Sequence, residues 1–292
     1  MGNDNTRPVE ADRMSDSLDR DDDAPLDRDD ADDINAIPHD RGPPAPSHET
    51  FGRRATFSVT HESTPSGTLI AGFSSYGLAG LTAGDYLIEH LELEVKGHVT
   101  AEGLPSITPF KKGRPRHPTR LYSADDVDVT VLVAEQFVPS VLGESLAKSV
   151  LEWTAANEVD EVAVLSGVPI PHGPDAHRTF YIATDDYRET RLADADVPPM
   201  ESGFLDGVNA ALLERGMDSP LGVGLFVTPV HAQAPDVEAA VRLVETATDL
   251  YGLDVDAGPL EAFAAEIRRH YEDLAERIEE REPEGTYDRM YM

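Results

Sequence analysis

Short apolar runs alternate with amphipathic helical segments along most of this chain, and this alternation constrains its fold more than any other feature. A run of four to eight apolar residues bounded by turn residues is typical of a buried strand, whereas apolar residues spaced by three and four are typical of a helix. Strands are expected at residues 55–62, 67–73, 92–100, 127–137, 160–168, 178–184 and 220–230. Helices are expected at residues 76–91, 141–159, 201–216 and 235–252.

This order predicts an α/β fold in which helices cover a mostly parallel sheet on both faces. The strand at residues 127–137 is apolar almost throughout, so we expect it near the centre of the sheet. The helix at residues 201–216 is expected to begin at Glu201 and Ser202 and to end at Gly216. The α/β domain is predicted to span residues 53–257.

A longer amphipathic helix is predicted after this domain, at residues 258–282. Its apolar residues form one stripe at spacings of three and four, namely Leu260, Phe263, Ile267, Tyr271, Leu274 and Ile278. The stripe fits packing on the parent domain as well as packing on another subunit. Pro283 and Gly285 end the helix, so residues 283–292 are predicted to form a flexible tail.

The net charge of the chain excludes some partners. Asp and Glu total 56 against 24 Lys and Arg, which gives −32 over 292 residues. Such a chain repels nucleic-acid phosphates, so nucleic-acid binding is not expected. An acidic, lysine-poor surface is also typical of proteins adapted to high salt, where counterions screen the repulsion. We therefore predict a halophilic protein. Residues 1–52 are acidic and poor in apolar residues, which predicts a disordered tail.

The predicted location in the cell rests on the absence of membrane-spanning stretches, a signal peptide and cysteine from this sequence. No stretch approaches the roughly 20 apolar residues that cross a bilayer, and the first residues do not resemble a signal peptide, so no membrane partner is expected. The chain contains no cysteine, which excludes disulfides and Cys-ligated zinc and fits a reducing cytoplasm. The predicted location is cytoplasmic, and neither a metal nor a cofactor is expected.

A glycine- and serine-rich turn at residues 72–84 follows the second predicted strand. Its small residues fit close packing of a helix on a sheet, and they also fit a ligand site at a strand end. The spacing matches neither a phosphate loop nor a dinucleotide fingerprint. If a ligand binds, a nucleoside or phosphate is the candidate, with His172, His177 or His231 as acid or base. The candidate ligand or packing residues are Gly72, Ser74, Ser75, Gly77 and Gly80. His172, Asp175 and His177 lack the fixed spacing of a metal site.

The one basic cluster of the chain lies at residues 109–120. It fits contact with an acidic partner or a second subunit, and it fits equally a loop that only relieves local repulsion. The candidate contact residues are Lys111, Lys112, Arg114 and Arg116. No catalytic triad or pair of carboxylates is distinguished by its spacing.

The chain ends in Met290, Tyr291 and Met292, an apolar residue, a tyrosine and a terminal carboxylate. Tethered beyond the helix-breaking residues, these three could fill a crevice, with the tyrosine hydroxyl and the carboxylate each finding a polar partner. The order hydrophobic-Tyr-any resembles the motif by which proteasomal ATPases and other activators dock between α-subunits of the proteasome core particle.

The α/β part independently resembles the proteasome assembly chaperone family in its archaeal form. The similar stretches occur in the same order in this chain, at residues 69–91, 132–153, 162–171 and 236–261. The resemblance implies an α/β three-layer fold similar to nucleoside phosphorylases, without known catalytic residues. It also implies homo-oligomers and, in some members, binding to the α-ring of the core particle as assembly chaperone or ATP-independent activator.

The resemblance therefore favours a non-catalytic proteasome-binding protein that docks through Met290, Tyr291 and Met292. Two alternatives stay open at this point. One is a small-molecule enzyme that uses the turn at residues 72–84, and the other is an oligomeric scaffold with a different protein partner.

Overall fold

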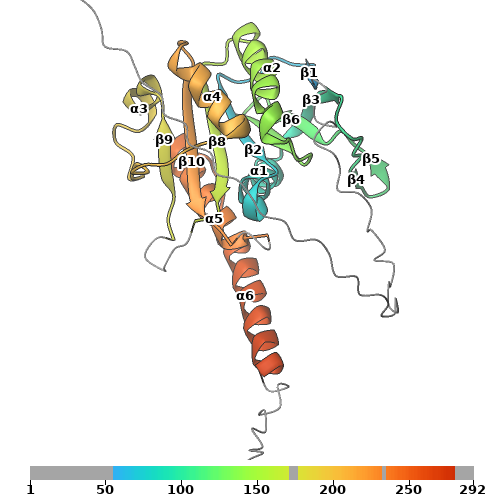
Figure 1. Ribbon diagram of the computed structural model, residues 1–292, viewed down its shortest axis with the longest axis vertical. Helices are drawn as coiled ribbons and strands as arrows, with labels where there is room; N and C mark the ends of the chain where they lie inside the picture. The colour runs from blue at the N-terminus through green and yellow to red at the C-terminus, as the bar shows by residue number, and fades with distance from the viewer. Residues whose placement is uncertain (1–54, 171–176, 232–234, 280–292) are drawn as a thin grey trace, which may run out of the picture. The chain divides into compact units, whose positions relative to one another are not determined.

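The computed structural model describes residues 55–170, 177–231 and 235–279, with side chains described as far as Arg269. Eight strands form one sheet in the order β1-β3-β6-β7-β2-β8-β10-β9 (Figure 1). The central strands β7, β2, β8 and β10 are parallel, and the strands outside them pair antiparallel. The bounds are Thr56–His61 (β1), Thr68–Phe73 (β2), Glu94–Glu102 (β3), Thr119–Ser123 (β6), Thr130–Ala134 (β7), Glu161–Val168 (β8), Phe180–Ala183 (β9) and Gly222–Pro229 (β10).

Helices cover both faces of this sheet. One face carries α2 and α4, which pack on each other, and the opposite face carries α1 and α5. The helices are Ala79–His90 (α1), Gly143–Ala156 (α2), Asp185–Arg191 (α3), Gly207–Met217 (α4), Val237–Tyr251 (α5) and Gly258–Glu279 (α6). The predicted α/β fold, with a parallel centre between two helical layers, is confirmed.

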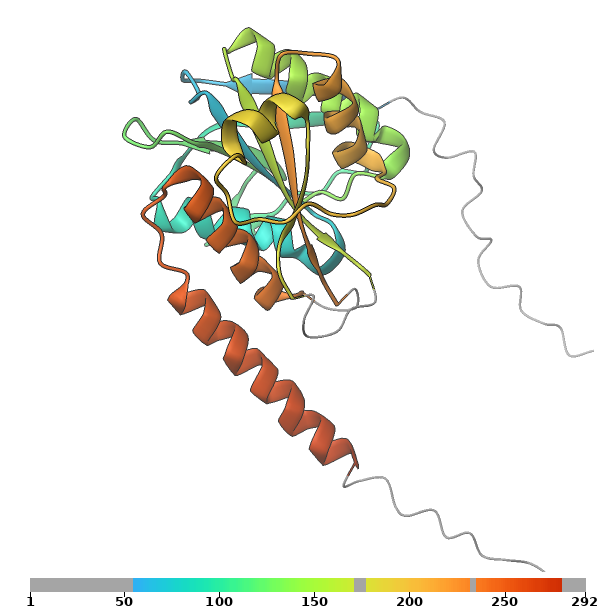
Figure 2. The same cartoon turned by 90° about the vertical axis from the view of Figure 1, so that its left-hand side faces the viewer.

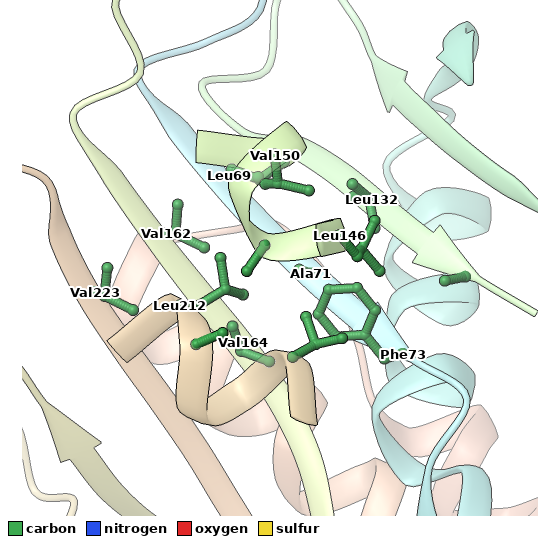
Figure 3. Close-up of a cluster of buried hydrophobic side chains, with 14 of the residues drawn as sticks. Leu69, Ala71, Phe73, Leu132, Leu146, Val150, Val162, Val164, Leu212 and Val223 are labelled. Carbon is green, nitrogen blue, oxygen red and sulfur yellow. The ribbon is translucent and has the colours of Figure 1, made fainter. Parts of the chain in front are cut away.

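Strand periodicity places the core on both faces of the sheet. In β2, Leu69, Ala71 and Phe73 point to α2 and α4, whereas Ile70 points to α1 and α5. Figure 3 shows the first of these clusters, in which Leu146 and Val150 of α2 and Leu212 of α4 meet apolar side chains of β2, β7, β8 and β10. Burying a side chain such as leucine stabilises the fold by about 1.5–3 kcal/mol. The central strands are continuous apolar runs in the sequence because their side chains are buried on both faces of the sheet.

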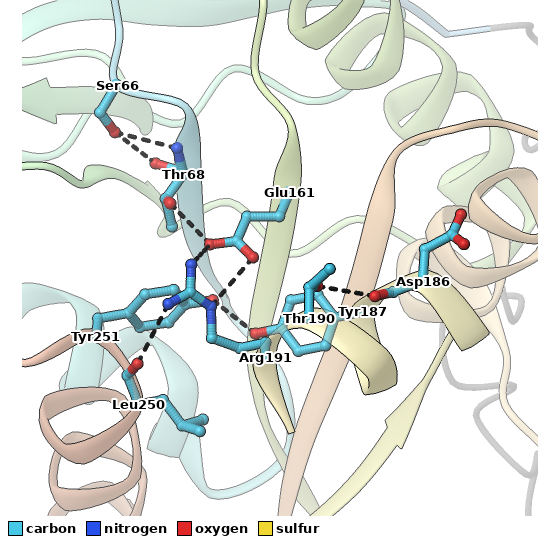
Figure 4. Close-up of polar contacts among 9 residues, drawn as sticks. All are labelled: Ser66, Thr68, Glu161, Asp186, Tyr187, Thr190, Arg191, Leu250 and Tyr251. Carbon is cyan, nitrogen blue, oxygen red and sulfur yellow. Dashed lines mark hydrogen bonds and ion pairs between the residues drawn. The ribbon is translucent and has the colours of Figure 1, made fainter. Parts of the chain in front are cut away.

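A polar cluster lies at the amino end of β8 (Figure 4). Glu161 accepts a hydrogen bond from the Thr68 hydroxyl at 2.8 Å and forms an ion pair with Arg191 of α3. The Arg191 guanidinium also lies over the Tyr251 ring, 4.7 Å from its centroid. Burial raises the pKa of both Tyr187 and Tyr251, whose hydroxyls lie 2.6 Å apart. The cluster ties α3 and α5 to the sheet.

The start of α4 differs from the prediction. The helix begins at Gly207, with Asp206 as its N-cap residue, and not at Glu201 and Ser202. Residues 201–204 are exposed, and burial on the helix begins only at Val208. The sequence pattern includes Phe204 and Leu205 in the apolar face of this helix because both are apolar, although they lie in the segment that precedes it.

The predicted loop at residues 109–120 is also wrong in part. It contains a small hairpin of β4 (Phe110–Lys111) and β5 (Arg114–Pro115), and β6 begins at its end. β6 was not predicted from the sequence because a charged residue, Arg120, occupies a fully buried position in this strand. The short helix α3 was missed as well, since only Tyr187 among its seven residues is buried.

The last described helix, α6, follows α5 in the chain (Figure 2). Its first turns contact α5, with Leu260 and Ala264 buried, and Arg268 Nη1 lies 2.5 Å from Glu238 Oε1. Phe263 stays more than half exposed on the same helix. Of the predicted apolar stripe, Leu260 is thus buried and Phe263 is exposed, and whether the rest of the helix packs on the domain or on another subunit stays a prediction.

Candidate functional site

The predicted docking residues Met290, Tyr291 and Met292 lie outside the described residues, as do His172 and Asp175. The structure describes the chain that leads to the docking residues as far as Glu279, the last residue of α6. The remaining candidate residues belong to two places, the carboxyl ends of the central strands and the β4–β5 hairpin.

The glycine-rich turn joins β2 to α1 at the centre of the sheet. A Cβ atom at Gly80 would overlap the carbonyl oxygen of Leu165 in β8, and one at Gly72 would overlap the carbonyl oxygen of Gly80. Gly77 has a φ of 65° and lies against the Val230 side chain. These glycines therefore let α1 approach β2 and β8 more closely than any larger residue would permit.

The two serines of the turn have different surroundings. The backbone N–H of Ser74 donates to the Ala134 carbonyl oxygen at 2.9 Å, which joins the end of β2 to the end of β7. The Ser75 Oγ atom is buried and has no hydrogen-bond partner among the described residues. Most buried hydroxyl groups in proteins have a hydrogen-bond partner, so the Ser75 hydroxyl is an exception in this turn.

A cavity of about 990 Å³ opens beside this turn, at the carboxyl ends of β2, β8 and β10. In open α/β sheets, ligands and partners occupy the crevice where successive connections leave in opposite directions. Here that point lies between β2 and β8, because the chain leaves β2 toward β3 on one side of the sheet and leaves β8 toward β9 on the other. The polar groups that line the cavity include Ser74, Ser75, Ser166 and Asn209, whose Nδ2 donates to Ser166 Oγ at 3.2 Å.

Aromatic side chains border the cavity and were not predicted as functional. Tyr76 and Phe137 are each more than half exposed, and Phe204 is fully exposed. Asp206 is the one charged residue among the described residues that line the cavity. The described lining therefore offers no lysine or arginine that could form an ion pair with a phosphate. The sequence signal was present but ambiguous, since Phe137 ended a predicted strand and Phe204 fell inside a predicted helix. The hypothesis that a nucleoside binds at the turn stays a prediction.

The structure describes two histidines of the second hypothesis, His177 and His231. The rings of His177 and His231 meet edge to face with centroids 6.4 Å apart, and His231 Nδ1 lies 2.9 Å from Asp236 Oδ2. Burial acts to raise the pKa of Asp236, but the N–H groups of His231 and Ala239 lower it below its usual value. Asp236 caps α5 through the Ala239 N–H. Within the described residues, no group of three His, Asp or Glu residues could hold a metal ion.

The basic cluster divides into an exposed part and a buried part. Lys111, Lys112 and Arg114 are exposed on the β4–β5 hairpin. Arg116, by contrast, lies 2.5 Å from Glu135 Oε1, and Arg120 reaches the same oxygen at 2.7 Å. The Arg116 guanidinium thus pairs with Glu135 within the fold, and its contact with a partner stays a prediction.

None of the described helices is long and apolar enough to cross a membrane. The comparison with known proteins matches residues 69–275 to the model of the PAC2 family. The uncharacterized protein MJ0106 of Methanocaldococcus jannaschii is 26% identical over 212 residues, which are 71% of this chain and 85% of that protein.

Two solved structures from Pyrococcus furiosus share the fold. PbaA, described as an archaeal homolog of proteasome-assembly chaperone, has a TM-score of 0.69 at 23% identity and covers 78% of this chain and 94% of its own. PbaB, described as an archaeal proteasome activator, has a TM-score of 0.64 at 19% identity and covers 76% of this chain and 99% of its own. The resemblance of the α/β part to this family is confirmed, and the chain belongs to the PAC2 family.

Proposed function

We propose that this chain is a non-catalytic, homo-oligomeric proteasome-binding protein of the cytoplasm, acting as an assembly chaperone or as an ATP-independent activator. The observation that carries the proposal is its membership of the PAC2 family, together with the fold that it shares with PbaA and PbaB. The printed descriptions of those two proteins, a proteasome-assembly chaperone homolog and a proteasome activator, supply the two roles.

The proposed contact is made by Met290, Tyr291 and Met292, which dock in the pockets between α-subunits of the core particle. Two sequence features support this: the hydrophobic-Tyr-any order, and the helix-breaking Pro283 and Gly285 before it. Ten residues from 283 to 292 reach at most about 33–36 Å when extended, so the tripeptide can enter a pocket while the domain stays outside the particle.

Several tails acting together would make the contact strong. A single tripeptide buries little surface and binds weakly. In an oligomer, however, the first docked tail holds the others near neighbouring pockets, and the gain in avidity reaches about 10²–10⁴-fold when the geometry permits. Oligomerisation is therefore part of the proposed function.

The test compares the intact protein with a form that lacks residues 290–292, both immobilised and exposed to purified core particle. We expect the truncated form to retain roughly 10-fold less core particle or worse, because it loses each of the multivalent contacts. Tyr291→Ala should behave like the truncation, whereas the matched control Asp288→Ala changes the same tail outside the tripeptide and should bind normally. Equal retention by intact and truncated proteins would contradict the docking proposal.

The same proteins distinguish the two roles. An activator raises the hydrolysis of a fluorogenic peptide by assembled core particle. A chaperone leaves that rate unchanged and increases the yield of rings from free α-subunits. Loss of either effect on Tyr291→Ala assigns that role to the docked tail, and an effect that survives the substitution assigns it to another part of the chain.

A further inference from the structure

The β4–β5 hairpin carries an exposed apolar residue and three cations at its tip. Phe110 is 74% exposed, and Lys111, Lys112 and Arg114 are exposed beside it. Lys112 and Gly113 have φ values of 52° and 76°, as the two central residues of a type I′ turn require. The Arg116 N–H donates to the Pro109 carbonyl oxygen at 2.9 Å and closes the base of the hairpin. Such a preordered element loses little conformational entropy when it binds.

The charge of this tip is unusual for the chain. The whole sequence carries −32, yet three of its 24 Lys and Arg residues cluster on this short hairpin. Lys111, Lys112 and Arg114 form no ion pair with any residue that the structure describes, whereas the neighbouring Arg116 and Arg120 both pair with Glu135. The hairpin therefore exposes three positive charges to solvent next to the exposed phenyl ring of Phe110.

The cavity at the strand ends has the complementary properties. Tyr76, Phe137 and Phe204 border it with exposed rings, and large exposed apolar patches mark interaction surfaces. The charged group among its described lining residues is Asp206, and Glu201 is exposed in the segment that leads to it. The surface is thus an apolar recess whose described lining contains one carboxylate, Asp206, and no cation, with Glu201 exposed beside it.

We propose that the hairpin of one copy of this chain docks in the cavity of a second copy. Phe110 enters the apolar recess, and the three cations of the tip face Asp206 and Glu201 of the neighbour. Both halves of the contact are present in every copy, and the remainder of a chain with a charge of −32 repels its neighbour, so a contact needs this local reversal of sign. The inference rests on the homo-oligomer of the proposed function and names its interface.

The contact joins two different surfaces, so it repeats from head to tail. Such heterologous contacts close into a ring when the rotation between copies permits. In a single copy Phe110 is exposed, which shows that the hairpin does not fill the cavity of its own chain. Figure 1 shows the hairpin (β4, β5) beyond β6, on the side of the sheet opposite to β9.

Engineered cysteines test the geometry directly, because the native chain contains none. Lys112→Cys and Ser202→Cys are made separately in the full chain, mixed, and oxidised. We expect a disulfide that joins the two different variants, identified by mass spectrometry, and little cross-linking of either variant with itself. Cross-links within each variant alone would show an interface that pairs identical surfaces and would overturn the proposal, as would no cross-link at all.

Sedimentation velocity measures the oligomeric state of variants in which the apolar or the charged residues of the proposed interface are changed. Phe110→Ser should weaken self-association roughly 10-fold or more, because a phenyl ring loses its buried site. The control Met217→Ser removes another exposed apolar side chain outside both surfaces and should leave the oligomer intact. Lys111→Glu should also weaken the oligomer and Asp206→Lys should do the same, whereas the two together should restore association. Lys148→Glu, on the exposed side of α2, controls for net charge.

The rescue by the paired reversal keeps the test valid if one variant folds poorly. An unchanged oligomer in Phe110→Ser, or no rescue by the pair, would overturn the interface. Removal of residues 290–292 should leave self-association unchanged, so the interface and tail docking fail independently. An oligomer that dissociates with Phe110→Ser while the truncation still binds core particle would support the interface and contradict the docking proposal.

Discussion

Arg120 of β6 and Glu135, just after β7, form an ion pair with 2.7 Å between Nη2 and Oε1. The Arg120 side chain is only 2% exposed, and Nε donates to the Tyr122 hydroxyl at 2.6 Å while Nη1 donates to the His117 carbonyl oxygen. Arg116 reaches the same Glu135 oxygen at 2.5 Å. One carboxylate thus serves two guanidinium groups, and it holds the base of the basic hairpin to the middle of the sheet.

Glu135→Ala should lower the free energy of unfolding by about 3 kcal/mol, because it leaves the buried Arg120 charge without its counterion. The matched control is Glu144→Ala, which removes the exposed partner of Arg215 at 3.1 Å and should cost less than about 1 kcal/mol. Urea unfolding at fixed salt measures both losses. Equal losses in the two variants would show that burial of the Arg120 pair contributes nothing.

Gly80→Ala should destabilise the protein by about 1–3 kcal/mol, since the added Cβ meets the Leu165 backbone and α1 must move away from β8. Gly203→Ala is the control, because a Cβ at Gly203 has no atom within 4 Å. A shift in Tm of about 2–4 °C per kcal/mol makes the difference measurable in a domain of this size. A Gly80→Ala variant as stable as Gly203→Ala would contradict the close approach of α1 to the sheet.

Elements with strong apolar periodicity were predictable from the sequence. The run at residues 127–137 contains β7, a central strand, and the segment at residues 235–252 contains α5, which ends before Gly252 in the left-handed conformation. In both cases the local pattern and the tertiary burial agree, because the buried face is made of the residues that the pattern identifies. The glycine-rich turn was also located correctly, at the carboxyl end of β2.

The elements that were missed depend on partners distant in the sequence. β6 became a strand through pairing with β3 and β7, and the Arg120 charge is tolerated there because Glu135, just after β7, forms an ion pair with it. Phe204 looked like part of a helix, although the helix begins at Gly207 and leaves Phe204 exposed at the cavity. A cavity formed by the ends of several strands has no signature in any one segment, and the aromatic residues around it could not be grouped from spacing.

The stacked pair His98 and His117, with ring centroids 3.7 Å apart, should make stability depend on pH. Burial lowers the pKa of His98 below its usual value of 6.5, and the nearby His117 lowers it further, while Glu62 acts in the opposite direction. Because the folded pKa is below the unfolded one, the contribution is complete above 6.5 and is lost as pH falls through the folded pKa. His98→Phe keeps a ring in the stack and should lose less stability than the native protein between about pH 7 and pH 5.5. Urea midpoints at each pH measure this, and parallel curves for the two proteins would contradict it.

Stability should rise with salt, because the net charge of −32 makes the folded chain repel itself. The Debye length falls from about 10 Å at 0.1 M to about 3 Å at 1 M, so KCl at molar concentration screens neighbouring surface carboxylates from one another. The buried pair of Arg120 and Glu135 is screened much less, so salt removes repulsion at the surface without dissolving that contact. We expect Tm to increase by at least about 2–4 °C between low and molar KCl, the shift produced by one kcal/mol in a domain of this size.

An osmotically matched series in sucrose separates screening of charge from the general stabilisation of compact states. A Tm that is constant or falls with KCl would contradict the halophilic interpretation, and a Tm that rises equally in sucrose would show that charge screening is not the cause.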